Sequence, residues 1–418
     1  MRIAFKTFGC RLNHAEALDA EARFEADGHQ IVELDAAAPP DVIVVRGCSV
    51  TAKAQHDCEK EIARLRRRFP TADIRLTGCL PTASAVAARR REETMEEAVE
   101  SPIPLRTSRA YLKVQDGCSG RCAFCIVPHF RGPPVSVPFA HVLARARAFL
   151  AAGYRELVVT GCNLALYHDA GRRLPDLLAA LAVLTGPSPV HRIRLGSLEP
   201  GLCAPALLDV MAAHPKICRF LHLSLQSGSN RILKRMNRPY TVEDVSAFCA
   251  QAVHLLGTRL ALGADVIAGF PGETDTDHAA TLRFLSNPLN LSLPSAPDAS
   301  PDASHVPFFS LLHVFPYSER PGTPAATMEG ALPRPVRLAR ARELEALGHR
   351  QRAVFARSFV GQEVEVCVER GGDHGWTAEY LPCRLVSPAP RRSLVTVRIA
   401  SCDARPSLTG MPAAFIYH

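Results

Sequence analysis

The 418-residue sequence has no uninterrupted apolar run of about 18 residues, the length that a membrane-spanning helix needs. The segment Met1–Lys6 also lacks the apolar core of a secretory signal. Signatures of serine hydrolases and of phosphate-binding loops are missing as well, and the isolated glycines form no dinucleotide fingerprint. We therefore expect a cytoplasmic protein without a membrane anchor that is neither a serine hydrolase nor a protein with a phosphate-binding loop or a dinucleotide fingerprint.

The composition indicates a globular chain with metal-binding capacity. Fourteen cysteines are too few at this length for a secreted disulfide scaffold, and six of them fall into patterns that suit metal clusters in a reducing compartment. A 47% share of hydrophobic residues supports two to four domains of about 100 to 200 residues each. The net charge of +8 mildly favours a polyanionic partner such as RNA.

Three cysteines form the most informative local pattern, Cys118-x3-Cys122-x2-Cys125, directly after a strand predicted at Tyr111–Gln115. Iron–sulfur clusters are held by cysteine thiolates, usually four. A 4Fe–4S cluster that is bound by only three keeps an open coordination position on one iron, where a small molecule can bind. A zinc site or buried free cysteines are the alternatives for these three loop cysteines.

Three further cysteines, the strand-end cysteines Cys10, Cys48 and Cys79, each follow a glycine at the end of a predicted strand. The predicted strands span residues 2–8, 41–45 and 73–76, and helices are predicted at 14–27 and 52–69. Because the carboxyl ends of parallel strands lie along one edge of a sheet, the three thiols can gather there. Three buried structural thiols are the alternative.

With these motifs the sequence resembles the radical S-adenosylmethionine (SAM) enzymes, and residues 1 to about 90 resemble the amino-terminal domain of the methylthiotransferases. The resemblance implies that the loop cysteines hold a 4Fe–4S cluster whose open iron binds SAM and whose electron cleaves SAM to a 5′-deoxyadenosyl radical. It implies that the strand-end cysteines hold a second 4Fe–4S cluster, which carries the transferred sulfur. Arg46-Gly47 stands where the family usually has Asn-Thr, so we expect different contacts near Cys48.

After the loop cysteines, predicted strands alternate with predicted helices. The strands are expected at 156–161, 191–197, 220–226, 260–269 and 308–315, and the helices at 141–152, 175–184, 204–213 and 242–256. With the strand at Tyr111–Gln115 they make six βα units, which predict an α/β fold with an open (β/α)6 barrel. Function is then expected at the carboxyl ends of the strands.

Polar or glycine residues follow four of these strands, and the family resemblance implies that they surround bound SAM. They are Thr160, Gly161, Ser197, Glu199, Gln226, Ser227, Gly269 and Glu273. Ordinary solvent capping of strand ends is the alternative for any one of them. Arg131 also fits the family, whereas Val135 and Val137 stand where arginines are common.

We expect three domains, with boundaries near residues 100 and 357. Residues 1–100 form the amino-terminal parallel α/β cluster domain plus a linker, residues 101–357 the radical SAM domain, and residues 358–418 a small β-barrel that resembles the TRAM domain. The Pro-, Ser-, Ala- and Asp-rich residues 288–306 are predicted to be a disordered insertion.

The TRAM-like segment balances six arginines with six acidic residues, so we expect another element to supply much of the attraction to tRNA. The candidate is a helix predicted at 333–357, which carries seven arginines. A solvated surface helix is the alternative. The eight cysteines outside both triads, Cys162 among them, are interpreted as small core residues.

The resemblance implies a tRNA methylthiotransferase that replaces C–H by S–CH3 at C2 of a modified adenosine beside the anticodon. Residues 6–13 and 312–325 are most similar to the branch that acts on N6-threonylcarbamoyladenosine. The isopentenyladenosine branch is the nearest alternative, followed by a ribosomal-protein aspartate methylthiotransferase and a non-enzymatic metal-containing RNA-binding protein. The implied partners are a tRNA anticodon stem-loop, an external electron donor and a sulfur source. No catalytic side chain beyond the cluster ligands is predicted.

Overall fold

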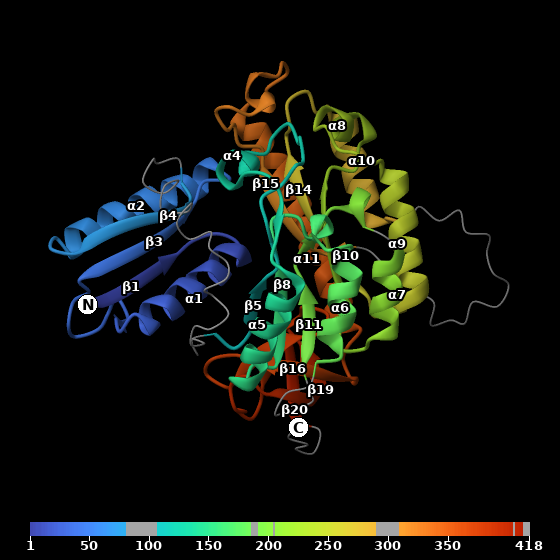
Figure 1. Cartoon of the computed structure of the whole chain (residues 1–418). Coiled ribbons are helices and arrows are strands. Elements are labelled where there is room, and N and C mark those ends of the chain that lie inside the picture. The colour runs from blue at the N-terminus through green and yellow to red at the C-terminus, as the bar shows by residue number, and fades with distance from the viewer. Residues whose placement is uncertain (81–106, 185–190, 204, 290–308, 404–405, 413–418) are drawn as a thin grey trace.

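The computed structural model describes residues 1–80, 107–184, 191–203, 205–289, 309–403 and 406–412. It begins with a parallel four-stranded sheet in the order β2-β1-β3-β4 (Figure 1). The strands are β1 (Arg2–Thr7), β2 (Gln30–Ile31), β3 (Val42–Cys48) and β4 (Asp73–Cys79). Helices α1 (Arg11–Ala26) and α2 (Ala52–Arg68) lie on opposite faces of this sheet.

Strand β3 shows why the sequence folds this way. Its side chains alternate between the two faces, so Ile43 and Val45 pack with Leu65 of α2, while Val42 and Val44 pack with Phe24 of α1. A strand covered on both faces has a continuous apolar sequence. Both β3 and β4 continue through their Gly-Cys pairs, so the strands end later than the sequence predicts.

The central part is a curved set of parallel strands that forms the predicted open barrel. Its strands are β5 (Ala110–Lys113), β8 (Glu156–Thr160), β11 (Arg192–Leu195), β12 (Ser197–Leu198), β13 (Phe220–Gln226), β14 (Ala261–Ala268) and β15 (Phe309–Pro316). They form two sheets, β11-β8-β5 and β12-β13-β14-β15. Only Gly196 separates β11 from β12, so these two count as one strand and the (β/α)6 prediction is confirmed.

Helices cover the outer face of this barrel (Figure 1). They are α5 (Phe139–Ala151), α6 (Leu174–Ala182), α7 (Pro205–Ala213), α8 (Asn230–Arg235), α9 (Val242–Leu256), α10 (Asp275–Ser286) and α11 (Arg334–Arg357). Thr241 is the N-cap of α9, and its side chain and Asp244 form a capping box, as expected for an N-cap threonine. Among the described residues, none of the helices is both long and apolar enough to cross a membrane.

The side chains of the barrel strands alternate between the helix-covered face and the inner face, and polar residues lie on the inner face. Leu221, Leu223 and Leu225 of β13 belong to the apolar core under the helices. Because strand side chains alternate, His222 and Ser224 face the inside. Shorter elements lie between the barrel strands in the chain: α4 (Val127–Arg131), β6 (Gln115–Asp116), β7 (Val135–Ser136), β9 (His168–Asp169) and β10 (Arg172–Arg173). Strand β6 pairs with β7, β9 pairs with β10, and a hydrogen bond between His168 and Ser136 joins the two pairs.

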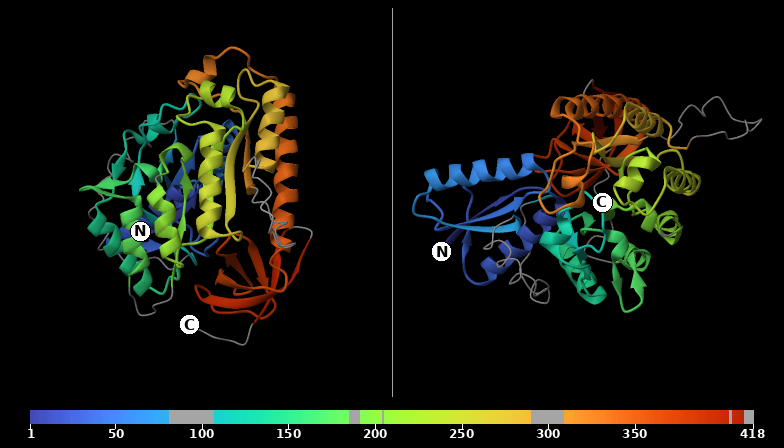
Figure 2. Two further views of the ribbon diagram at one scale, coloured as in Figure 1. Left: turned by 90° about the vertical axis from the view of Figure 1, so that its right-hand side faces the viewer. Right: turned by 90° about the horizontal axis from the view of Figure 1, so that it is seen from above.

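A closed five-stranded barrel follows α11, in the order β16-β17-β18-β20-β19. Its strands are β16 (Glu363–Val368), β17 (His374–Thr377), β18 (Pro382–Leu385), β19 (Leu394–Cys402) and β20 (Leu408–Pro412). Its core includes Phe220 and Ala261, which begin β13 and β14, so it packs on the amino ends of the central strands (Figure 2). The predicted TRAM-like barrel is therefore present.

The domain boundaries near residues 100 and 357 stay a proposal. Position 100 lies outside the described residues, as does nearly all of the predicted insertion at 288–306. Arg357 is the last residue of α11, which leads directly into the small barrel.

Candidate iron–sulfur and SAM site

The loop cysteines gather at the carboxyl-end side of the barrel, just after β6. The backbone N–H of Gly120 donates to Cys118 Sγ at 3.2 Å. A Cβ atom at Gly120 would lie 3.2 Å from Cys118 Sγ and 3.7 Å from Cys122 Sγ, so a side chain here would crowd both sulfurs. Burial raises the pKa of Cys122 and raises that of Cys125 to about 12, so these thiols need a bound cation to ionise.

Arg238 is a charged group that contacts this loop directly. Its guanidinium donates to Cys122 Sγ at 2.8 Å and to the Ser224 carbonyl at 3.0 Å, and it pairs with Glu199 at 3.3 Å. Glu199 was predicted from the sequence, and it also accepts from the Asn163 amide at 2.7 Å. Sequence reasoning missed Arg238, because 116 positions separate it from Cys122 and no local pattern links them.

The strand-end cysteines gather at one edge of the amino-terminal sheet. Cys48 and Cys79 are paired in register on β3 and β4, and Cys10 is the N-cap of α1. Gly9 has φ +90°, and a Cβ atom there would lie only 3.0 Å from Cys48 Sγ, so this position requires glycine. Burial raises the pKa of Cys48 to about 11, to which the neighbouring Cys10 and Cys79 contribute.

Arg131 connects the two cysteine groups. Its guanidinium donates to Cys79 Sγ at 3.1 Å, to Asp116 at 2.9 Å and to Asn13 at 2.8 Å. It also pairs with Glu16 of α1 at 2.9 Å. Because Asp116 lies two residues before Cys118, Arg131 holds the start of the cysteine loop against the strand-end triad.

Glu16 is the acidic centre of this junction. Besides Arg131, it pairs with Arg46 and with Lys113, each at 2.8 Å. Burial alone would raise the pKa of Glu16, but the three cations hold it well below its ordinary value. The departure at position 46 thus has a structural account, since the buried Arg46 neutralises Glu16. Cys162 lies beside the same junction, 3.4 Å from Asp116, rather than in the apolar core that the sequence suggested.

The residues predicted to surround SAM lie at the carboxyl ends of the central strands, and several have partners within the protein. Ser227 contacts Thr281, and Glu273 accepts from the Gly269 N–H at 2.9 Å and from Arg340 at 2.6 Å. Glu199 contacts Arg238 and Asn163, as described above. The others end or follow β8, β11 and β13, and they are Thr160, Gly161, Ser197 and Gln226. Contact of all eight with SAM stays a prediction.

The donor chemistry of both triads suits iron–sulfur clusters. Each triad offers three thiols, and hydrogen bonds reach their sulfurs from the Gly120 N–H, Arg238 and Arg131. Iron–sulfur clusters are usually held by four thiolates, so three leave one iron with an open position. A structural zinc site almost always takes four protein ligands. Three cysteines at each site therefore suit a 4Fe–4S cluster with one open iron better than structural zinc.

Family models match most of the chain. The radical SAM superfamily model matches residues 112–285, and the model described as uncharacterized protein family UPF0004 matches residues 2–99. The solved structures with a similar fold include the apo form of the cobalamin-dependent SAM radical enzyme OxsB, with a TM-score of 0.52, 12% identity and coverage of 82% of this chain and 61% of that chain. The radical SAM methyltransferase TsrM from Kitasatospora setae has a TM-score of 0.50, 15% identity and coverage of 68% and 70%.

Two curated relatives extend over nearly the full length. A threonylcarbamoyladenosine tRNA methylthiotransferase MtaB from Chlamydia pneumoniae is 32% identical over 417 residues, which is 94% of this chain and 93% of that protein. A tRNA-2-methylthio-N(6)-dimethylallyladenosine synthase from Cereibacter sphaeroides is 32% identical over 410 residues, covering 89% and 88%. Together with the radical SAM match, these relatives show that the chain belongs to the tRNA methylthiotransferase family of radical SAM enzymes, whose cofactors are SAM and two 4Fe–4S clusters.

Proposed function

We propose that this chain is a tRNA (N6-threonylcarbamoyladenosine-C2) methylthiotransferase that acts in the cytoplasm. It places a methylthio group on C2 of the modified adenosine beside the anticodon. The observation that carries the proposal is the junction at Arg131, which links the loop cysteines to a second cysteine triad. A radical enzyme that inserts sulfur needs a second place that holds the sulfur close to the radical.

Two observations support this substrate over its nearest alternative. Residues 6–13 and 312–325 resemble the threonylcarbamoyladenosine branch, and the first of these segments contains Cys10 and Asn13, which belong to the site. The Chlamydia relative of that branch also covers somewhat more of the chain than the Cereibacter relative does. The isopentenyladenosine branch remains the second candidate, because both relatives are equally identical to this chain.

We assign the loop cysteines to the SAM-cleaving cluster and the strand-end cysteines to the sulfur-carrying cluster. When bound, the clusters supply the electron for SAM cleavage and a site for the sulfur, and a second SAM supplies the methyl group. Arg238 orients the Cys122 thiolate and Glu199, and Arg131 holds the Cys79 thiolate and fixes α1 against β6. Buried hydrogen bonds of this kind keep ligand side chains in one orientation.

We also propose that eight residues at the strand ends surround SAM. They are Thr160, Gly161, Ser197, Glu199, Gln226, Ser227, Gly269 and Glu273. The proposed partners are a tRNA anticodon stem-loop, an external electron donor and a sulfur source.

The experiment is mass spectrometry of tRNA nucleosides from cells that lack the protein. We expect the 2-methylthio form of N6-threonylcarbamoyladenosine to disappear while its precursor accumulates. Re-expressed wild type and a Cys218→Ala variant, which changes a buried cysteine outside both triads, should restore it, whereas Cys10→Ala should not. Loss of 2-methylthio-isopentenyladenosine instead would favour the second candidate. Unchanged tRNA together with an altered ribosomal peptide would overturn both.

A further inference from the structure

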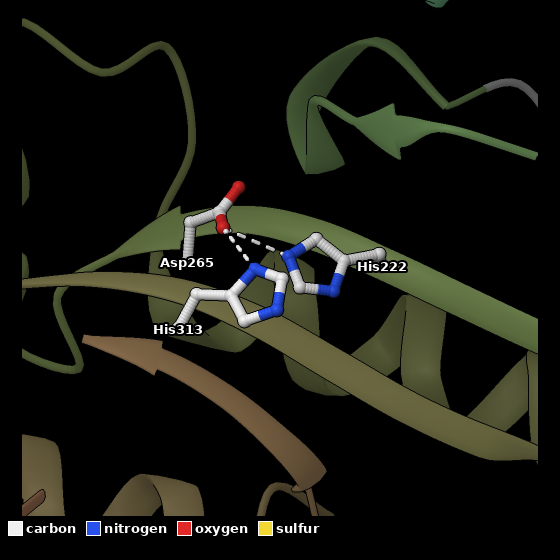
Figure 3. A group of neighbouring side chains, drawn as sticks. All are labelled: His222, Asp265 and His313. Carbon is white, nitrogen blue, oxygen red and sulfur yellow. Dashed lines mark hydrogen bonds and ion pairs between the residues drawn. The ribbon is translucent and has the colours of Figure 1, made fainter. Parts of the chain in front are cut away.

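A separate group of ligand-type side chains lies inside the barrel. His222 of β13, Asp265 of β14 and His313 of β15 converge on the inner face of three adjacent strands (Figure 3). We call them the inner-face cluster. Asp265 and His313 are directly paired in the β14–β15 register, and His222 is paired with Gly263, two residues from Asp265. Residues two apart on a strand share a face, which explains why all three meet.

The distances within the inner-face cluster suit a single metal ion. One oxygen of Asp265 lies 2.9 Å from His222 Nε2 and 3.3 Å from His313 Nδ1, and the three candidate ligand atoms all lie within 4.8 Å of one another. Ligands bound to a divalent transition ion at about 2.0 to 2.2 Å lie about 3.0 to 3.5 Å from one another in tetrahedral or octahedral geometry. The two measured separations are close to that range.

The surrounding residues hold the ligands in place. A Cβ atom at Gly263 would lie 2.4 Å from His222 Nδ1, so glycine is required for the His222 ring to occupy its position. Ser224 approaches the second oxygen of Asp265 at 3.5 Å.

The inner-face cluster also has room for further ligands. The His222 side chain is almost fully buried, whereas the His313 side chain is 46% exposed and that of Asp265 19% exposed. A metal here would keep open positions for water or for an oxygen or nitrogen donor, as three-ligand sites with two histidines and one carboxylate do. The cluster is also close to the radical site, because the Ser224 carbonyl accepts from Arg238, which contacts Cys122.

We propose that His222, Asp265 and His313 form a third metal site, distinct from both cysteine triads, for one divalent transition ion such as Zn²⁺ or Fe²⁺. The mixed nitrogen and oxygen ligands favour such ions over Mg²⁺ or Ca²⁺, which prefer all-oxygen sites. The proposal does not depend on which nucleoside the enzyme modifies.

The test uses zinc as the probe on full-length protein with reconstituted clusters. After equilibrium dialysis, we expect about one zinc per chain in addition to cluster iron. His313→Ala, chosen because this half-exposed ring contributes little to the core, and the isosteric Asp265→Asn should each weaken zinc binding by more than the roughly 10- to 100-fold typical of an outer-sphere change. His349→Ala, at an exposed histidine of α11, should leave zinc binding unchanged.

X-ray absorption at the zinc edge distinguishes zinc bound at the inner-face cluster from zinc bound by cysteines. We expect nitrogen and oxygen ligands at about 2.0 to 2.2 Å and no sulfur at about 2.3 Å. Sulfur ligation alone, no zinc beyond the clusters, or equal zinc in wild type and both ligand variants would overturn the proposal. Weakened tRNA binding by His313→Ala in a protein that binds no zinc would mean that the cluster contacts the substrate directly, which also overturns it. Thermal unfolding of each variant checks that the fold is intact.

Discussion

At the scale of single residues, arginines make the closest polar contacts to the proposed cluster ligands. Arg238 donates to Cys122 Sγ, and Arg131 donates to Cys79 Sγ. Hydrogen bonds to ligand sulfurs tune the reduction potential of an iron–sulfur cluster, and they raise it because they stabilise the added negative charge. The two arginines can therefore set the potentials of the two clusters separately.

Replacing Arg238 tests this role directly. We expect Arg238→Gln to retain its iron but to shift the potential of the loop-cysteine cluster to more negative values. SAM cleavage with a fixed reductant should slow by about tenfold or more, the factor that corresponds to the free energy of one charge-assisted hydrogen bond. Electron paramagnetic resonance during a redox titration measures the shift. Arg235→Gln is the matched control, because Arg235 donates to the backbone carbonyls of Pro271 and Glu329. An unchanged potential would assign Arg238 to packing alone.

The six cysteines could be predicted from the sequence because their signals are local. Three share one loop, and three follow glycines at strand ends. Arg131 was singled out by the family resemblance, but its contacts and the presence of Arg238 at the site could not be predicted, because these contacts form only when distant elements pack. The inner-face cluster could not be predicted either, because His222, Asp265 and His313 lie on three different strands and no local sequence pattern links them. Only the strand register reveals that the three meet.

At the scale of elements, the seven arginines of α11 do not all face solvent. Arg337 and Arg340 point inward, where Arg337 pairs with Glu319 and Arg340 with Glu273. Arg352 is also largely covered and donates to the Tyr380 carbonyl. The exposed arginines of the helix are Arg334, Arg342, Arg350 and Arg357. The sequence showed which residues of α11 were charged, but each inward arginine has its own partner from another part of the fold: Glu319, Glu273 or the Tyr380 carbonyl.

The two kinds of arginine should therefore respond differently to substitution. We expect the double change of Arg342 and Arg350 to Gln to reduce the slope of log affinity for tRNA against log salt by about one for each phosphate that the variant no longer binds. The stability of this double variant should barely change.

Arg340→Gln should instead destabilise the protein by about 3 to 5 kcal/mol, because Glu273 would remain buried without its charged partner. Binding titrations across salt and thermal unfolding separate these outcomes. An unaltered slope for the double variant would remove α11 from the tRNA interface.

At the scale of the whole molecule, a buried ion group joins the small barrel to the amino ends of the central strands. Glu156 pairs with Arg192 at 2.6 Å and with Arg194 at 2.8 Å, and all three side chains are buried. The same arginines donate to the carbonyls of Trp376 and Thr377 in the small barrel. The sequence predicted three domains in this order, but it could not predict the contact between the last two. Charged residues within a strand, such as Arg192 and Arg194, are expected to face solvent unless another domain is known to cover them.

Glu156 makes the stability of this junction dependent on pH. Burial would raise the pKa of Glu156, but Arg192 and Arg194 hold it below the ordinary glutamate value of about 4.3. A lowered pKa in the folded state contributes stability that is complete above the unfolded pKa and is lost as the pH falls toward the folded pKa.

At pH 7 we expect Glu156→Gln to lower the free energy of unfolding by about 3 to 5 kcal/mol, since two buried guanidinium groups lose their counter-charge. The gap between variant and wild type should narrow below about pH 4, where the wild type begins to lose this contribution. Unfolding midpoints in urea from pH 7 to pH 3 measure the gap, with Glu363→Gln at an exposed position of β16 as the control. A gap that stays constant over this range would show that the charge of Glu156 does not hold the two units together.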